Sequence, residues 1–143
     1  MNPAYVDANV ILRFLTGDPP DMADRAAALF GRVERGELHL IVETVVLAEV
    51  VWVLQSFYHY RPAEIAPVVR EFLLQDGIEA EDKALLLQAL SLYEARNVDF
   101  ADALVAARMQ ERGVAEIFSF DKHFDRLPGV RRRVPGEESA EAL

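Results

Sequence analysis

Short apolar runs alternate with longer helical patterns along most of this chain, and this alternation constrains the fold more than any other feature. The opening AYVD, residues 38–42, EIFSF and residues 130–134 read as strands, with a brief further candidate beginning at Ile78. Strands separated by helices require crossover connections, so we expect an α/β fold with a parallel sheet covered by helices on both faces. In such sheets, functional crevices lie beyond the carboxyl ends of the strands.

The length of 143 residues is enough for one hydrophobic core and too short for two ordinary domains. We expect one domain over residues 1–134 and a polar tail over 135–143, because Pro135 and Gly136 interrupt the last strand pattern. The start of the chain has no basic leader and no segment reaches the apolar length of a membrane span, so we expect a cytoplasmic protein that does not contact membranes.

Cysteine is absent, which excludes disulfides, thiolate zinc sites and a cysteine nucleophile. Any metal must therefore be held by oxygen atoms or by histidines. The histidines are scattered and form no metal-ligand spacing, so we expect surface or packing roles for them. They are His39, His59 and His123.

The net charge of −9 argues against nonspecific binding of nucleic acid through bulk positive potential. Many of the acids fall on expected solvated helix faces or in the tail, whereas the basic residues at 131–133 form one compact run. The charge therefore constrains association without excluding chemistry on a phosphate.

Glu49 is the only charged residue between Thr44 and Gln55, in a helical pattern that is apolar nearly all round. We expect this helix to be buried, where an unpaired carboxylate costs several kcal/mol or becomes protonated. Glu49 then needs a cation or a route to solvent. The alternatives are that it points outward or pairs with an arginine from a neighbouring element.

Four aspartates stand at the ends of elements, and each has a structural explanation of its own. Asp7 and Asp121 follow expected strands, where Asp commonly stabilises a loop or caps the next helix. Asp99 and Asp102, three residues apart at a helix start, resemble a capping box. Asp99 looks like the cap, and Asp102, one turn further, is better placed to face inward.

Taken together, Asp7, Glu49, Asp102 and Asp121 can converge at one rim of the sheet. Like-charge repulsion would oppose such a cluster without a cation, and oxygen ligands indicate a hard ion, Mg²⁺ or Mn²⁺. Supporting positions have competing explanations: Asn9 either joins this shell or caps the first helix, and Ser119 either supports Asp121 or the substrate or is an ordinary strand hydroxyl. A further acid, Asp125, either faces the site or is solvated.

Four segments, VDANVILRFLTGDPP, VVLAEVVWVL, VDFADALVAA and FSFDKHF, resemble in this order the motifs of PIN-domain ribonucleases, in particular VapC-type toxins of bacterial and archaeal toxin-antitoxin pairs. The resemblance covers most of the chain. It implies a single PIN-like domain with a central five-stranded parallel sheet flanked by helices. It also implies an acidic pocket that binds Mg²⁺ or Mn²⁺ through the four principal acids, each of them catalytic and metal-binding. Supporting positions match Asn9, Ser119, Asp99 and Asp125.

The resemblance implies cleavage of RNA, a cognate antitoxin that covers the active site, and a homodimer. Basic groups must guide RNA past an acidic rim, although arginines are more commonly solvated or salt-bridged. The candidates are Arg13, Lys122, Arg131, Arg132 and Arg133. Two other functions stay open. One is a Mg²⁺-dependent phosphohydrolase of the aspartyl-phosphate type, although such enzymes have a D-x-D motif at the first strand and this chain has Asn9 at the second position. The other is an inactive PIN-like protein-binding module.

Overall fold

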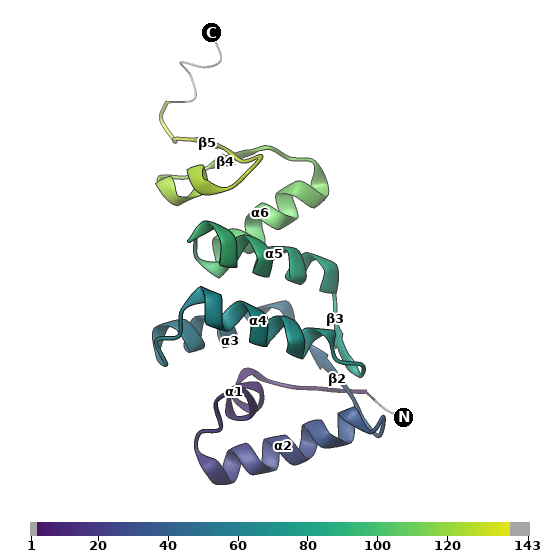
Figure 1. Ribbon diagram of the computed structural model, residues 1–143. Coiled ribbons are helices and arrows are strands. Elements are labelled where there is room, and N and C mark those ends of the chain that lie inside the picture. Colours follow the sequence, from purple (N-terminus) through teal and green to yellow (C-terminus); the bar gives the residue numbers. More distant parts are fainter. Residues whose placement is uncertain (1–2, 138–143) are drawn as a thin grey trace. The chain divides into compact units, whose positions relative to one another are not determined.

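A computed structural model describes residues 3–137, and these divide into two compact units, an N-terminal unit (3–83) and a C-terminal unit (84–137). Across the described residues, six α-helices and one 3-10 helix alternate with five strands (Figure 1). The expected polar tail falls partly on residues 138–143, which lie outside the described residues; residues 135–136 form a turn. No helix of residues 3–137 is both long and apolar enough to cross a membrane.

The N-terminal unit contains a three-stranded parallel sheet in the order β1-β2-β3. Ala4 of β1 is opposite Leu40 of β2, and Ile41 of β2 is opposite Glu79 of β3. The elements, in chain order, are β1 (Pro3–Tyr5), α1 (Ala8–Thr16), α2 (Pro20–Glu34), β2 (His39–Val42), α3 (Thr44–Ser56), α4 (Pro62–Leu74) and β3 (Ile78–Ala80).

The core of the N-terminal unit is built from apolar stripes of its helices. Phe30 of α2 contacts Phe14 of α1, with ring centroids 4.5 Å apart, and meets Phe72 of α4 edge to face at 5.5 Å. Leu47 and Ile11, from α3 and α1, are fully buried. Each such side chain stabilises the fold by about 1.5–3 kcal/mol relative to an exposed one.

The C-terminal unit contains a second parallel ladder, β4-β5, in which Ile117 is opposite Arg132. Tyr93 of the first helix and Phe100 of the second pack edge to face, with ring centroids 5.9 Å apart, and Ala103 is fully buried on the same helix as Phe100. The elements are α5 (Lys83–Arg96), α6 (Phe100–Arg112), β4 (Glu116–Phe118), the 3-10 helix η1 (Lys122–Arg126) and β5 (Arg131–Arg133).

The structure confirms the α/β class with parallel strands, and it adds detail to the expected five-stranded sheet. Five strands occur among the described residues, but their hydrogen bonds form a three-stranded and a two-stranded ladder, one in each unit. Each ladder is closed by a crossover inside its own unit: α1 and α2 connect β1 to β2, and the segment containing η1 connects β4 to β5. Whether residues 1–134 act as one domain stays a prediction.

Candidate metal centre

Asp102, Asp121 and His123 bring three potential metal ligands together in the C-terminal unit. One ligand atom from each side chain lies within 4.8 Å of the other two. Asp102 is half-buried in the first turn of α6, whereas Asp121 is the N-cap residue of η1. Two elements separated along the chain by a strand therefore present this cluster.

The loop between β4 and η1 holds Asp121 in a defined orientation. The Asp121 Oδ1 atom accepts a hydrogen bond of 2.8 Å from the backbone N–H of His123 and lies 3.2 Å from His123 Nδ1. The backbone N–H of Asp121 donates to Ser119 Oγ at 2.9 Å. Ser119 thus bonds the backbone that carries Asp121, and its supporting role in the site stays a prediction.

The electrostatics of the cluster oppose full ionisation. Burial, followed by the negative charges of Asp121 and Asp99, raises the pKa of the Asp102 carboxyl above its usual value, and His123 acts in the opposite direction. A cation bound between these groups would reverse the penalty, because opposite charge favours the ionised carboxylate. The cluster therefore has the charge that a divalent metal site requires.

One pair of donor atoms in the cluster also has a spacing that suits a divalent metal. Neighbouring ligands on an octahedral ion are about 3 Å apart when the metal–ligand distance is near 2.1 Å. The 3.2 Å between Asp121 Oδ1 and His123 Nδ1 is close to that spacing. Two carboxylates with one imidazole suit Mn²⁺ at least as well as Mg²⁺, because imidazole is a softer donor than oxygen.

His123 is the residue of this cluster that sequence reasoning missed. It was assigned a surface or packing role because no other histidine lies at a metal-ligand spacing from it. The signal was its position two residues after Asp121, which places both side chains on the first turn of η1. The contact of that turn with α6 depends on tertiary packing and cannot be predicted from the spacing of residues along the chain.

Asp99 differs from its expected role as the cap of α6. It occupies the N-cap position, but its side chain accepts no capping hydrogen bond. Its charge acts at a distance instead, adding to the raised pKa of Asp102. Burial, with a smaller contribution from Asp99, also raises the pKa of Tyr93 to about 12.

Asp7 and Glu49 belong to the N-terminal unit. Asp7 is the exposed N-cap of α1, and its Oδ1 accepts a 3.2 Å hydrogen bond from the Val10 N–H. This is the capping role that the sequence allowed for Asp7. A carboxylate has acceptor positions to spare, so the cap is compatible with a metal ligand. Asn9, two residues on, is exposed on the first turn of α1 and does not act as the cap.

The expectation that the helix carrying Glu49 is buried all round is wrong, and Glu49 points outward, as one of the alternatives allowed. The core side of α3 is formed by Leu47, Val50, Val51 and Leu54. Glu49 lies on the opposite, exposed stripe, between Val45 and Trp52, which are 74% and 66% exposed. The apolar composition of α3 did not reveal which face of the helix was outward, and the exposed Glu49 carboxylate has a route to solvent.

The four principal acids are thus divided equally between the two units. Asp102 and Asp121 lie together in the C-terminal unit, and Asp7 and Glu49 each occupy separate elements of the N-terminal unit. The convergence of all four on one metal stays a prediction.

The basic run on β5 is engaged in ion pairs. Arg132, whose side chain is only 14% exposed, forms two hydrogen bonds with Asp125, at 3.1 and 3.3 Å. This bond to Arg132 lowers the pKa of Asp125, which is therefore salt-bridged rather than simply solvated. Arg131 and Arg133 both bond Glu116, and Arg133 also lies over the Phe118 ring.

The other two basic candidates are less constrained. Arg13 donates one long hydrogen bond of 3.4 Å to the Asp18 carbonyl, and Lys122 is exposed at the start of η1. A role in binding RNA stays a prediction for all five basic residues.

The comparisons with known proteins extend over almost the whole chain. The PIN domain family matches residues 4–130, which extend through most of both units and include all four principal acids. A VapC ribonuclease of Aquifex aeolicus (strain VF5) is 28% identical over 134 residues, covering 94% of this chain and 98% of that protein. With the family matched over most of its length, and with the carboxylate cluster of the C-terminal unit inside the match, the chain belongs to the PIN domain family.

Proposed function

We propose that this chain is a divalent-metal-dependent endoribonuclease, and that it is the toxin of a VapBC-type toxin-antitoxin pair. The observation that carries the proposal is the Asp102–Asp121 cluster, in which one ligand atom from each of the two carboxylates and from His123 lies within 4.8 Å of the others. Similarity to a VapC ribonuclease along nearly the full length of both proteins supports the same activity.

We assign the metal site to Asp7, Glu49, Asp102 and Asp121, with His123 as a further candidate ligand. A bound Mg²⁺ or Mn²⁺ supplies a hydroxide nucleophile from water at neutral pH and positive charge for the leaving oxygen. The protein residues contribute the geometry: Ser119 holds the backbone of Asp121, and the His123 N–H orients its carboxylate. Asp99 and Asp125 act on this site through their charge and their ion pair rather than as ligands.

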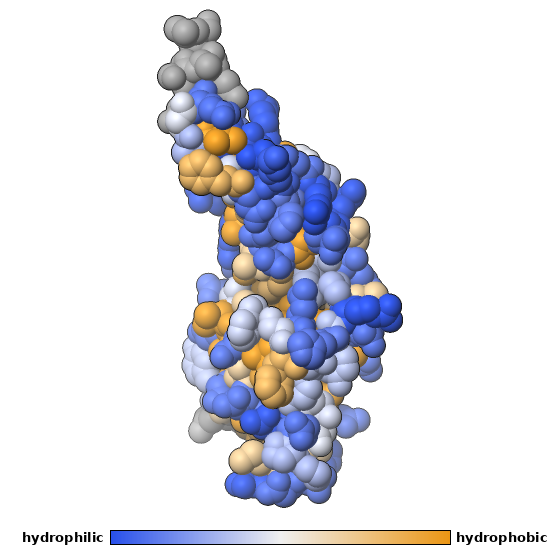
Figure 2. Space-filling view, turned by 90° about the vertical axis from the view of Figure 1, so that its left-hand side faces the viewer, coloured by the Kyte–Doolittle hydropathy of each residue, from blue (hydrophilic) through white to orange (hydrophobic). Residues whose placement is uncertain are grey.

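The proposed partners are RNA, a cognate antitoxin and a second copy of the chain, in the cytoplasm. Large apolar side chains are exposed on α3 and the segment after it, with Trp52 66% and Phe57 70% exposed. Figure 2 shows apolar patches of this kind interrupting a largely hydrophilic face. Exposed aromatic side chains such as these support a protein partner, because aromatic residues are enriched in protein interfaces.

The test is RNA cleavage by purified protein, freed of any partner, with EDTA, Mg²⁺ or Mn²⁺. Asp102→Asn and Asp121→Asn should abolish cleavage and weaken Mn²⁺ binding in calorimetry. Asp24→Asn, which removes an exposed carboxylate from α2, is the matched control and should behave as wild type. Equal cleavage by all four proteins would contradict the site. Hydrolysis of a phosphate monoester in place of RNA would favour the phosphohydrolase alternative, and retained partner binding without either activity would favour the binding module.

A further inference from the structure

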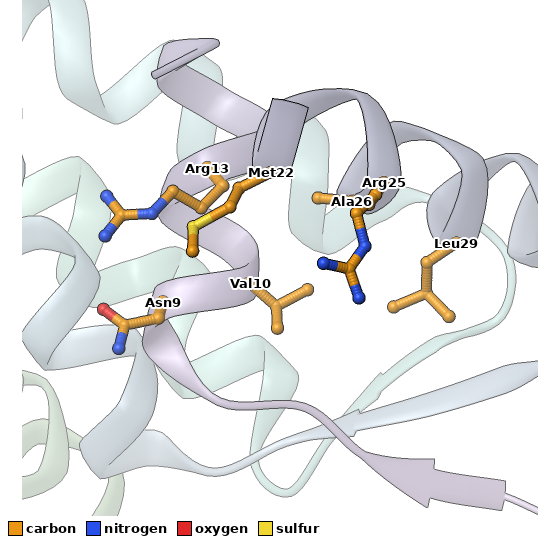
Figure 3. A pocket seen from close by; sticks show the side chains of 7 residues that line it. All are labelled: Asn9, Val10, Arg13, Met22, Arg25, Ala26 and Leu29. Carbon is orange, nitrogen blue, oxygen red and sulfur yellow. The ribbon is translucent and has the colours of Figure 1, made fainter. Parts of the chain in front are cut away.

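Helices α1 and α2 enclose an open hollow of about 440 Å³ on the N-terminal unit (Figure 3). Its volume is in the range of pockets that hold small organic groups, about 300–1,000 Å³. The side chains that line it include Asn9, Val10 and Arg13 from α1, and Met22, Arg25 and Leu29 from α2.

The hollow combines an apolar floor with two cationic groups. Figure 3 shows Val10 and Met22 between the guanidinium groups of Arg13 and Arg25. Among residues 3–137, Arg25 forms no ion pair, although Asp21 and Asp24 lie on the same helix. In a chain of net charge −9, an unneutralised arginine beside exposed apolar atoms is a feature that a ligand of opposite charge would use.

The hollow is close to Asp7, an acid of the proposed metal site, because residues that line the hollow follow Asp7 directly in the chain. Asn9 and Val10, two and three residues after Asp7, both line the hollow, and the Val10 N–H donates to the Asp7 carboxylate. Arg13 lies six residues beyond Asp7, roughly 9 Å along the helix axis at 1.5 Å per residue. If the reacting phosphate of an RNA strand lies at Asp7, the neighbouring nucleotides of that strand would therefore reach this hollow.

We propose that this hollow is a nucleotide subsite for single-stranded RNA, which rests on the ribonuclease function proposed above. The phosphates flanking one nucleotide bind Arg13 and Arg25, and its base lies on Val10, Met22 and Leu29. Arginine suits phosphate because its guanidinium donates two parallel hydrogen bonds.

A protein occupant fits the hollow less well than a nucleotide does. Stable protein interfaces involve about 20–30 residues on each side, whereas seven residues line this hollow. In the hollow, apolar surface lies between two cations, and in a single strand a base lies between two phosphates. Grooves that bind single-stranded nucleic acid likewise combine cationic groups for the phosphates with surfaces for the bases.

The experiment measures binding of a fluorescein-labelled RNA hexamer by anisotropy, in EDTA so that cleavage does not interfere. Arg25→Gln is compared with Arg32→Gln, a control with the same change of charge on the same helix, exposed and outside the hollow. For a single strand, each phosphate contact contributes about 0.7 to the slope of log K against log salt concentration. Arg25→Gln should lower the slope by about that amount, and the affinity by about tenfold. Arg32→Gln should leave the slope unchanged.

The base contact has its own readout, the same hexamer with abasic residues. Wild type should bind the intact strand several-fold more tightly than the abasic strand, and Met22→Ser should reduce that ratio. The subsite is overturned if Arg25→Gln and Arg32→Gln change the slope equally, or if wild type does not distinguish the two strands. Because no metal is present, the outcome is independent of cleavage: wild-type cleavage with an inert Arg25 refutes the subsite alone, and Arg25-dependent binding without cleavage refutes the proposed function alone.

Discussion

The two units present their acidic residues in opposite environments. In the C-terminal unit, Asp102 is half-buried beside Asp121 and within the field of Asp99, and its pKa is raised. In the N-terminal unit, Glu49 is exposed, and one carboxylate oxygen of Asp7 accepts the capping hydrogen bond of α1. The electrostatic demand for a cation therefore arises in the C-terminal unit, and Asp102 and Asp121 should anchor the metal.

The largest effect that follows is on metal affinity. Asp102→Asn should weaken Mn²⁺ binding by more than about a hundredfold, because removal of a ligand exceeds the 10–100-fold cost typical of losing an outer-shell group. Glu49→Gln, which changes an exposed carboxylate, should cost less. Calorimetric titration of the two variants compares the units directly, and a larger loss for Glu49→Gln would reverse the assignment of the anchor.

The distribution of these acids shows where sequence reasoning succeeded. Apolar periodicity located the strands and helices well: residues 38–42 were expected as a strand, and β2 covers His39–Val42. Asp7 and Asp121 were placed at strand ends because a strand-to-helix boundary is a local feature, and both cap the element that follows.

The remaining features depend on tertiary packing. The outward face of α3 could not be found, because apolar residues surround Glu49 on every side of the helix. The partners of three-residue strands could not be found either, since so short a strand carries little register information. His123 became a candidate ligand only when α6 and η1 were brought together.

The second prediction concerns the support of Asp121. Ser119→Ala removes the acceptor for the Asp121 N–H, and it should reduce Mn²⁺ affinity about tenfold, the lower end of outer-shell effects. Ser91→Ala is a suitable control, because Ser91 Oγ bonds only within α5, to the Leu87 carbonyl. Unchanged affinity in Ser119→Ala would mean that the loop holds Asp121 without this bond.

The third prediction separates the two roles of Asp7. Asp7→Ala should lower the free energy of unfolding by about 1 kcal/mol, because it removes the side-chain acceptor for the Val10 N–H. Asp7→Asn keeps a good capping residue and should retain most of that stability while it impairs metal-dependent cleavage. Urea denaturation in EDTA, beside the cleavage assay, tests both variants. If Asp7→Asn cleaves RNA as wild type does, Asp7 is a cap alone.

The smallest effect is a pH dependence of stability in the metal-free protein. Asp102 has a pKa raised above its usual value of 3.8, chiefly by burial, so folding favours its protonated form. Its contribution to stability is therefore fully present below the unfolded-state pKa and is lost as pH rises through the folded-state pKa.

Denaturation of wild type and Asp102→Asn in EDTA isolates this contribution, since the other carboxyls are common to both proteins. The wild type should lose stability relative to Asp102→Asn as pH rises from about 4 toward neutrality, and saturating Mn²⁺ should abolish that loss, because the cation stabilises the ionised carboxylate. A difference that does not vary with pH would mean that neither burial nor the nearby negative charges raise the pKa of Asp102 on folding, and the electrostatic contrast between the two units would be contradicted.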